Sequence, residues 1–263
     1  MTRPLVSCLM VTRDRVALAE RAVRCLVTQT WSAVELVVVD DGAADYAPML
    51  ARYRDRLRIR YAKLGPEPGR KLGELRNRAL GLADGELCAQ WDDDEWYHPD
   101  RLTRQVAPLV DGGAVASVLK WTLMHVDTPA MAELPYRADA GHGTRGTIVH
   151  RRTAVRYPNW ARSEDARFLD DLGRTGPVAV LGRDASHLFI RCFHGGNTWD
   201  ERHFQRRLRR TPLAAAHYLV ARLRGDLRRH PQLRLGAAEA AAVAAYRADS
   251  RALRLGTAGG VTA

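Results

Sequence analysis

The chain of 263 residues lacks several patterns that mark membrane, secreted and dinucleotide-binding proteins. No uninterrupted run of about 18 apolar residues occurs, so we expect no transmembrane helix. Met1-Thr2-Arg3-Pro4 leads into a short apolar segment without a small-residue cleavage site, and we therefore expect no secretory signal. No GxGxxG sequence follows the first predicted strand, so the sequence lacks the main evidence for an enzyme that binds a dinucleotide and transfers hydride.

Cysteine is scarce, and its spacing argues against a structural zinc site or a disulfide framework. The four cysteines form no close CxxC pair, and each lies in an apolar segment: Cys8, Cys25, Cys88 and Cys192. This pattern predicts buried free thiols in a reducing compartment, and it makes a structural zinc site improbable. We therefore expect a cytoplasmic protein.

Acidic residues are scarce in the last part of the chain. From residue 201 onward there are thirteen arginines and four acidic residues, which accounts for +9 of the total net charge of +11. Because the first 200 residues are nearly neutral, we expect no nucleic acid partner for them. The basic segment is either a solvated helical surface, a peripheral contact with anionic lipid at the inner membrane face, or a docking element for an acidic protein.

Apolar runs and helical periodicity alternate along the first half of the chain. Strands are predicted at residues 5–11, 34–40, 57–62 and 86–91, and helices at 16–28, 71–82 and 101–110. Parallel neighbours require crossover connections, so this alternation predicts an α/β fold with a mostly parallel sheet flanked by helices. Further strands are predicted at 115–124, 146–150 and 187–193, with a helix capped by Ser163 and a turn-rich, irregular segment at 128–142.

The change in composition near residue 200 predicts two parts. We expect one domain over residues 1–200, which divides into two halves at 1–110 and 111–200. Residues 201–263 are predicted to form a basic helical C-terminal extension.

Acidic residues follow two of the predicted strands. Asp92-Asp93-Asp94-Glu95 comes directly after the strand at 86–91, and Asp40-Asp41-Gly42 follows the strand at 34–40. Clustered carboxylates repel one another unless a cation shares them, so the first group predicts a divalent-metal site. The carboxyl ends of parallel strands meet at one edge, which indicates a nucleotide diphosphate site there. Asp40 alone could simply stabilise a turn.

Several of these motifs, in this order, resemble those of one enzyme family. They are Pro4-Leu5-Val6-Ser7, Gln29-Thr30-Trp31, Val39-Asp40-Asp41-Gly42, Arg76-Asn77, Gly85-Glu86, Asp92-Asp93-Asp94 and Pro99-Asp100-Arg101-Leu102. Residues 4–200 are similar to a family 2 glycosyltransferase of the GT-A fold. The resemblance implies an inverting enzyme of the hexosyltransferase type that uses a nucleotide diphosphate sugar, with UDP the family's commonest nucleotide. The acceptor hydroxyl would belong to a polysaccharide, a lipid-linked sugar or a natural-product glycoside.

The resemblance also implies that residues 1–110 form a nucleotide-binding half and residues 111–200 an acceptor and catalytic half, and it implies roles for residues on the donor side. Asp41, Thr12 and Arg13 would contact the nucleobase. Lys71 and Arg76 would offset phosphate charge. Asp92 and Asp93 would approach the ribose and the diphosphate.

The same resemblance implies a metal site and a catalytic base. Asp94, with Asp92 and His194, would bind Mn²⁺ or Mg²⁺, which stabilises the departing nucleotide diphosphate. Asp165, in the sequence Glu164-Asp165-Ala166-Arg167-Phe168, would take the proton of the acceptor hydroxyl.

Two alternative functions stay open at the level of sequence. A nucleotidyltransferase would use a similar sheet and similar acidic ligands, but Thr12-Arg13-Asp14-Arg15 does not resemble its glycine-rich basic loop. A non-catalytic module that binds nucleotide sugars is the second alternative, and the presence of Asp94 and Asp165 counts against it.

Overall fold

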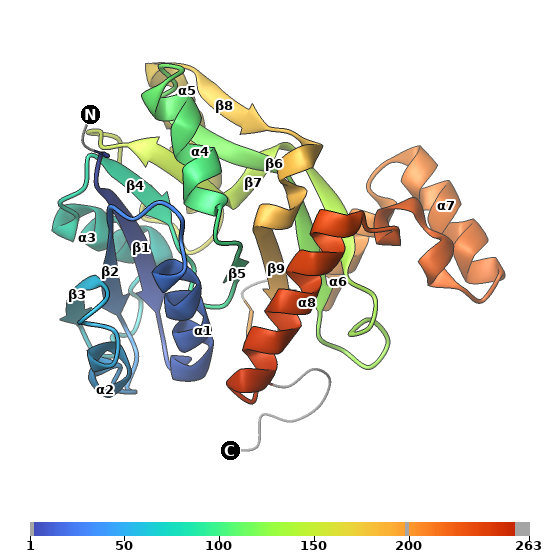
Figure 1. Cartoon of the computed structure of the whole chain (residues 1–263), viewed down its shortest axis with the longest axis horizontal. Coiled ribbons are helices and arrows are strands. Elements are labelled where there is room, and N and C mark those ends of the chain that lie inside the picture. Colours follow the sequence, from blue (N-terminus) through green and yellow to red (C-terminus); the bar gives the residue numbers. More distant parts are fainter. Residues whose placement is uncertain (1–2, 198–199, 256–263) are drawn as a thin grey trace.

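The computed structural model describes residues 3–197 and 200–255, and its N-terminal half is built from alternating strands and helices (Figure 1). The elements are β1 (Val6–Thr12), α1 (Val16–Val27), β2 (Val34–Asp40), α2 (Ala47–Ala51), β3 (Arg58–Lys63), α3 (Leu72–Leu82) and β4 (Leu87–Gln90). The four strands are parallel in the order β3-β2-β1-β4. Their carboxyl ends therefore meet at one edge of the sheet.

The second half extends the same sheet with antiparallel pairs. Its elements are β5 (Trp96–Tyr97), α4 (Arg101–Val110), β6 (Ala116–Val126), β7 (Tyr136–Arg151), α5 (Glu164–Thr175), β8 (Val178–Leu181), η1 (Arg183–Leu188) and β9 (Phe189–Phe193). The order continues β4-β7-β6-β9-β5, and β8 pairs with β6. The pairs β4 with β7, β6 with β7 and β5 with β9 are antiparallel, whereas the other pairs are parallel. The predicted α/β fold with a mostly parallel, helix-flanked sheet is thus confirmed.

Both faces of the sheet are covered, as the side chains of β2 show. Leu36, Val37, Val38 and Val39 are all fully buried, although alternate side chains of a strand point to opposite faces. Leu36 and Val38 pack in the cluster that contains α1, α4 and α8 side chains. Val37 and Val39 pack in the cluster that contains α3 and α5 side chains. A continuous apolar run is therefore the sequence pattern that this three-layer arrangement requires.

The prediction of an irregular segment at residues 128–142 is wrong for its last part. β7 begins at Tyr136, which pairs with Met124 of β6, and runs through to Arg151. Gly141 and Gly143 have φ values of 70° and 115°, which favour glycine. These glycines interrupt the sequence pattern by which a strand is recognised. The antiparallel pairing with β6 supplies the backbone hydrogen bonds that the local sequence does not indicate.

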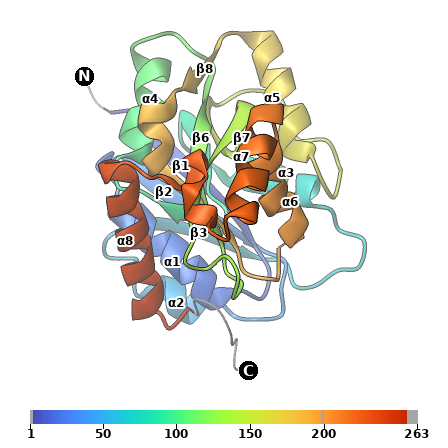
Figure 2. The same ribbon diagram turned by 90° about the vertical axis from the view of Figure 1, so that its right-hand side faces the viewer.

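The C-terminal part contains α6 (Glu201–Gln205), η2 (Arg206–Arg209), α7 (Pro212–Leu223), η3 (Leu227–Arg229), η4 (Pro231–Leu233) and α8 (Ala237–Ala252). Figures 1 and 2 show α8 on the same side of the sheet as α1. Ala242, Val243 and Tyr246 of α8 join the main core, and Arg21 Nη1 donates to Ser250 Oγ at 3.1 Å. The domain division at residue 200 stays a prediction, and α8 contributes to the core of the preceding residues.

The four cysteines are free and buried, as the sequence predicted. Their burial raises the pKa of each thiol, to about 12 for Cys25, Cys88 and Cys192. Over residues 3–197 and 200–255, the structure contains no helix with the length and apolarity needed to cross a membrane.

Candidate active site

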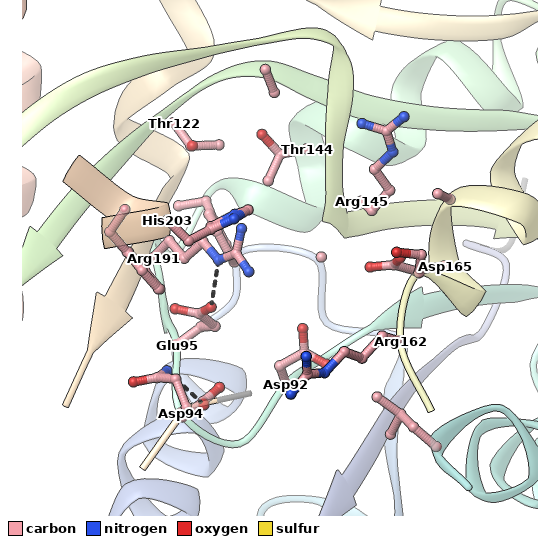
Figure 3. Close-up of a pocket in the computed structure, with 18 of the residues that line it drawn as sticks. Asp92, Asp94, Glu95, Thr122, Thr144, Arg145, Arg162, Asp165, Arg191 and His203 are labelled. Carbon is pink, nitrogen blue, oxygen red and sulfur yellow. Dashed lines mark hydrogen bonds and ion pairs between the residues drawn. The ribbon is translucent and has the colours of Figure 1, made fainter. Parts of the chain in front are cut away.

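A cavity of about 460 Å³ opens where the ends of β1 and β4 face β6, β7, β9 and the start of α5 (Figure 3). Of the predicted site residues, those that line this cavity are Arg76, Asp92, Asp93, Asp94 and Asp165. The structure thus brings side chains from both halves of the chain to one site. Because the strands of the first half are parallel, the polar residues that follow them lie at the same edge of the sheet, beside this cavity.

Asp93 is held by residues from the end of β1. The Thr12 hydroxyl donates to Asp93 Oδ2 at 2.6 Å, and Arg15 Nη2 donates to Asp93 Oδ1 at 2.7 Å. Burial raises the pKa of Asp93 to about 7, although the positive charge of Arg15 opposes this shift. Thr12 therefore lies beside the acidic group, behind the cavity lining.

One carboxylate oxygen of Asp94 is contacted by three nitrogen donors. This Oδ2 atom lies 2.9 Å from Arg15 Nη1, 3.3 Å from His194 Nε2 and 3.3 Å from Asn197 Nδ2. Burial disfavours the charged form, but the hydrogen bond from His194 and the charge of Arg15 lower the pKa of Asp94 to about 2. Asp94 and His194 are thus adjacent and their role as metal ligands stays a prediction, whereas the participation of Arg15 was not predicted.

Arg76 of α3 joins the acidic strand end to the start of α5. Its Nη2 atom donates to Asp92 Oδ1 at 3.1 Å, and its Nε atom donates to Glu164 Oε1 at 2.9 Å. Asp92 also accepts from Gln90 Nε2 at 3.0 Å. Arg76 and Glu164 are buried, so each charge depends on the other for compensation.

Asp165 lines the same cavity as Asp92 and lies above it in the view of Figure 3. It follows Glu164 in the first turn of α5, where Ser163 is the N-terminal cap residue as predicted. The Ser163 side chain makes no capping hydrogen bond, and its φ of 61° is left-handed. Within residues 3–197 and 200–255, no protein group forms a hydrogen bond or an ion pair with the Asp165 carboxylate. This carboxylate is therefore available to a ligand.

The residues predicted to contact the nucleobase and the phosphates are more dispersed. Asp41 follows β2, is 2% exposed, and forms an ion pair with Arg70 and a longer one of 3.7 Å with Arg13. Lys71 is the exposed residue that precedes α3. Thr12, Arg13, Asp41 and Lys71 lie outside the lining of the cavity. They surround the neighbouring edge formed by β1, β2 and α3.

The predicted metal ligands form only part of a coordination shell. In the described part of the chain, no group of three or more His, Cys, Asp or Glu side chains is arranged to hold a metal ion. Asp94 Oδ2 and His194 Nε2 are 3.3 Å apart, close to the roughly 3 Å that separates adjacent ligands around one Mn²⁺ or Mg²⁺ ion. A carboxylate oxygen and an imidazole nitrogen suit Mn²⁺, and the residues present fit such an ion if a ligand supplies the remaining oxygens.

Sequence reasoning missed five arginines that line this cavity, one of which, Arg162, directly precedes Ser163. Arg15 pairs with Asp93 and Asp94, whereas Arg145, Arg191 and Arg207 line the wall farther from the β1 end. Arg15 lies three residues beyond β1, and this position after a strand end could have identified it as a site residue. Arg145, Arg191 and Arg207 come from β7, β9 and η2, and nothing in the local sequence indicates that these elements meet.

Comparison with known proteins identifies the family. A sequence model described as Glycosyl transferase family 2 matches residues 7–144. The succinoglycan biosynthesis protein ExoO of Rhizobium meliloti is 34% identical over 107 residues, which cover 41% of this chain and 30% of that protein. Validoxylamine A glucosyltransferase of Streptomyces hygroscopicus is 37% identical over 92 residues, covering 34% of this chain and 22% of that protein. These matches thus span less than a third of the relatives' length.

Solved structures share the fold at low sequence identity. S. aureus TarS 1-349 in complex with UDP has a TM-score of 0.57 and 17% identity, over 84% of this chain and 74% of that chain. The mannosyltransferase PcManGT from Pyrobaculum calidifontis, in complex with GDP-Man and Mn²⁺, has a TM-score of 0.55 and 19% identity, over 96% and 76% of the two chains. The fold is that of the GT-A glycosyltransferases.

Proposed function

Because this chain belongs to glycosyl transferase family 2, we propose that it transfers a sugar, with inversion, from a nucleotide diphosphate sugar to an acceptor hydroxyl. UDP is the preferred candidate for the nucleotide, since the TarS complex contains UDP, and GDP is the alternative suggested by the PcManGT complex. The buried free thiols support a cytoplasmic location. The acceptor belongs to polysaccharide, lipid-linked or natural-product glycoside synthesis.

The observation that carries this proposal is the Asp165 carboxylate. It lines the same cavity as Asp92, and no described protein group binds it. A base in this position removes the proton of the acceptor hydroxyl while the acceptor oxygen forms a bond to the anomeric carbon. The bond from that carbon to the diphosphate oxygen breaks on the opposite side of the sugar, so the anomeric configuration inverts.

The residues of the Asp92–Asp94 side hold the donor in this proposal. Arg76 bridges Asp92 and Glu164, and its guanidinium offsets negative charge beside the donor phosphates. Asp41, Thr12, Arg13 and Lys71 bind the nucleobase and the phosphates at the adjoining edge. Asp92 and Asp93 contact the ribose and the diphosphate, with Asp93 held in place by Arg15.

Asp94 and His194, with Asp92, would hold a divalent ion. When bound, Mn²⁺ or Mg²⁺ neutralises the charge that develops on the departing diphosphate. Arg15 donates to the same Asp94 oxygen as His194, so this arginine supplies the compensating charge in the structure described here.

A thermal-shift experiment with UDP-, GDP-, dTDP- and CMP-sugars tests the donor and the metal together. We expect one nucleotide class to raise the melting temperature by about 5 to 10 °C at a ligand concentration about a hundred times the Kd, and only with Mn²⁺ or Mg²⁺ present. Removal of the metal with EDTA should abolish the shift. A folded protein that responds to none of these donors contradicts the proposed function.

We further propose that α7 rests on an anionic membrane surface. Four apolar side chains on one side of this helix are exposed, with exposed fractions of 68% for Leu213, 60% for Leu219, 46% for Val220 and 79% for Leu223. Exposed arginines flank them, at positions 209, 210, 222 and 224. Figure 1 shows α7 projecting at the end of the molecule farthest from α2 and α3. Apolar side chains bordered by arginine suit the interface of a bilayer that contains acidic lipid.

Co-sedimentation with vesicles tests this surface. We expect binding to phosphatidylcholine vesicles that contain phosphatidylglycerol, with affinity that falls as salt is added. The double variant Leu219→Asn/Leu223→Asn should bind at least about tenfold more weakly, because it buries less apolar area in the lipid. Val110→Asn, at an exposed apolar position on α4, is the matched control and should bind normally. Equal binding by the double variant and the control contradicts the proposal.

A further inference from the structure

The cavity wall farther from β1 carries three arginines that the proposed donor site does not use. Arg145 lies in β7, Arg191 in β9 and Arg207 in η2, and all three line the cavity. Figure 3 shows Arg145 above Asp165 and Arg191 above Glu95, on the side of the cavity that faces away from Asp94. We name these three residues the arginine cluster.

Charge is balanced on the donor side and unbalanced in the arginine cluster. Arg15 has Asp93 and Asp94 as partners, and Arg76 has Asp92 and Glu164. In the arginine cluster, the one acidic partner that the described residues provide is Glu95, whose Oε1 atom lies 3.7 Å from Arg191 Nε. The wall therefore carries surplus positive charge.

The local structure holds Arg145 in the cavity wall. Ser117 of β6 pairs with Val149 of β7, but Leu119 pairs with Thr144, so the β7 segment between these pairs is bulged. Gly143 has a φ of 115°, and a Cβ atom there would lie 2.4 Å from Val118 Cγ2. A Cβ atom on Gly146 would lie 3.2 Å from Asp92 Oδ2. Arg145 thus lies on a constrained bulge between Gly143 and Gly146, and the backbone of Gly146 approaches Asp92.

Two of the three arginines, Arg145 and Arg207, have no side-chain hydrogen bond or ion pair with the residues that the structure describes. Arg145 Nε is buried, and it has no hydrogen-bond acceptor among the residues that the structure describes. Burial, together with the charges of Arg191, Arg210 and Arg145, lowers the pKa of Arg207. Arg191 is placed by its contact with the Phe204 ring, at 5.2 Å from the ring centroid.

We infer that the arginine cluster binds an anionic group, a phosphate or a carboxylate, carried by the acceptor. The three arginines are half-buried, so water only partly compensates their charge, and a bound anion would compensate it through charge-assisted hydrogen bonds. Arg145 lies beside Asp165, so an acceptor anchored there presents its hydroxyl to the proposed base. This inference rests on the proposed function, which names the nucleotide sugar as the donor and a hydroxyl-bearing molecule as the acceptor.

The first test measures phosphate binding directly. With saturating UDP and Mn²⁺ occupying the donor site, inorganic phosphate should raise the melting temperature of the wild-type protein. In the variant Arg145→Gln/Arg207→Gln, the phosphate Kd should rise about ten- to a hundredfold, because each arginine supplies charge-assisted hydrogen bonds. The control Arg54→Gln, an exposed arginine near α2, should behave as wild type. Equal phosphate binding by the double variant overturns the inference.

The second test separates acceptor binding from donor binding. Sugar monophosphates and uronic acids are compared with their neutral parent sugars as acceptors, with nucleotide release as the readout. We expect at least a tenfold preference in kcat/KM for the charged acceptors, and its loss in the double variant. The UDP affinity of that variant should stay within about twofold of wild type. A parallel loss of UDP affinity would mean that the cluster binds the donor diphosphate and would overturn the inference.

Failure of the proposed function gives a different result. A protein that binds no nucleotide and releases none refutes the transferase proposal, and phosphate titration without nucleotide then still tests the arginine cluster. A protein that binds UDP but not phosphate refutes the anion site and leaves the transferase proposal intact.

Discussion

Replacing Asp165 with asparagine is expected to lower the turnover number for sugar transfer by about a hundredfold to ten-thousandfold. Asparagine keeps the size of the side chain but cannot accept the proton of an acceptor hydroxyl. The carboxylate has no hydrogen-bond or ion-pair partner among the described residues, so its loss should leave the fold and the other cavity contacts unchanged. Donor affinity should remain within about twofold of wild type, because the proposed donor contacts lie on the Asp92–Asp94 side.

The measurement combines steady-state kinetics with donor binding by calorimetry. Asp170→Asn, an exposed position on the same helix, is the matched control and should retain full turnover. Wild-type turnover by Asp165→Asn would show that another group accepts the proton. A fall in donor affinity as large as the fall in turnover would assign Asp165 to donor positioning, since a base acts mainly on the chemical step.

Replacing Arg76 with alanine is expected to lower the free energy of unfolding by about 3 to 5 kcal/mol at neutral pH. This side chain is buried and pairs with both Asp92 and Glu164, so its removal leaves two carboxylates without their counter-charge. Burial already raises the pKa of Glu164, and Arg76 opposes that shift. Without Arg76, the folded state should therefore bind the Glu164 proton more tightly than the unfolded state does.

The sign of the pH dependence follows from that difference in proton binding. When the folded state binds more protons, stability decreases as the pH rises, so the defect of Arg76→Ala should shrink as the pH falls from 7 toward 5. Urea unfolding at several pH values measures this. Adding Glu164→Gln to Arg76→Ala should recover part of the lost stability, because it removes one uncompensated charge.

The exposed pair between Arg78 and Glu74, on the same helix, supplies the comparison for Arg76. Arg78→Ala should cost only about 0.5 kcal/mol, since solvent screens this pair. A cost for Arg76→Ala as small as that for Arg78→Ala would contradict the structural role assigned to Arg76.

The first half of the site was predictable because strand patterns and topology together place its residues. The apolar segments that became β1, β2 and β4 end in Thr12, Asp40-Asp41 and Asp92-Asp93-Asp94, and parallel strands bring such ends to one edge. The role assigned to Asp165 came from the family motif, since an acid in a first helical turn more often only stabilises the helix. Its place in the cavity agrees with that prediction, and its catalytic role stays a prediction.

By itself the sequence determined the alternation of strands and helices, the burial of the cysteines and the acidic strand ends, because these follow from local patterns of apolar and polar residues. Only the tertiary structure decided which charged and polar side chains contact one another. Arg15 pairs with Asp93 across 78 residues of chain, Arg76 with Glu164 across 88, and Arg21 with Ser250 across 229. The bulge that places Arg145 arises from pairing with β6. Such contacts depend on how distant elements pack, and no local pattern records that packing.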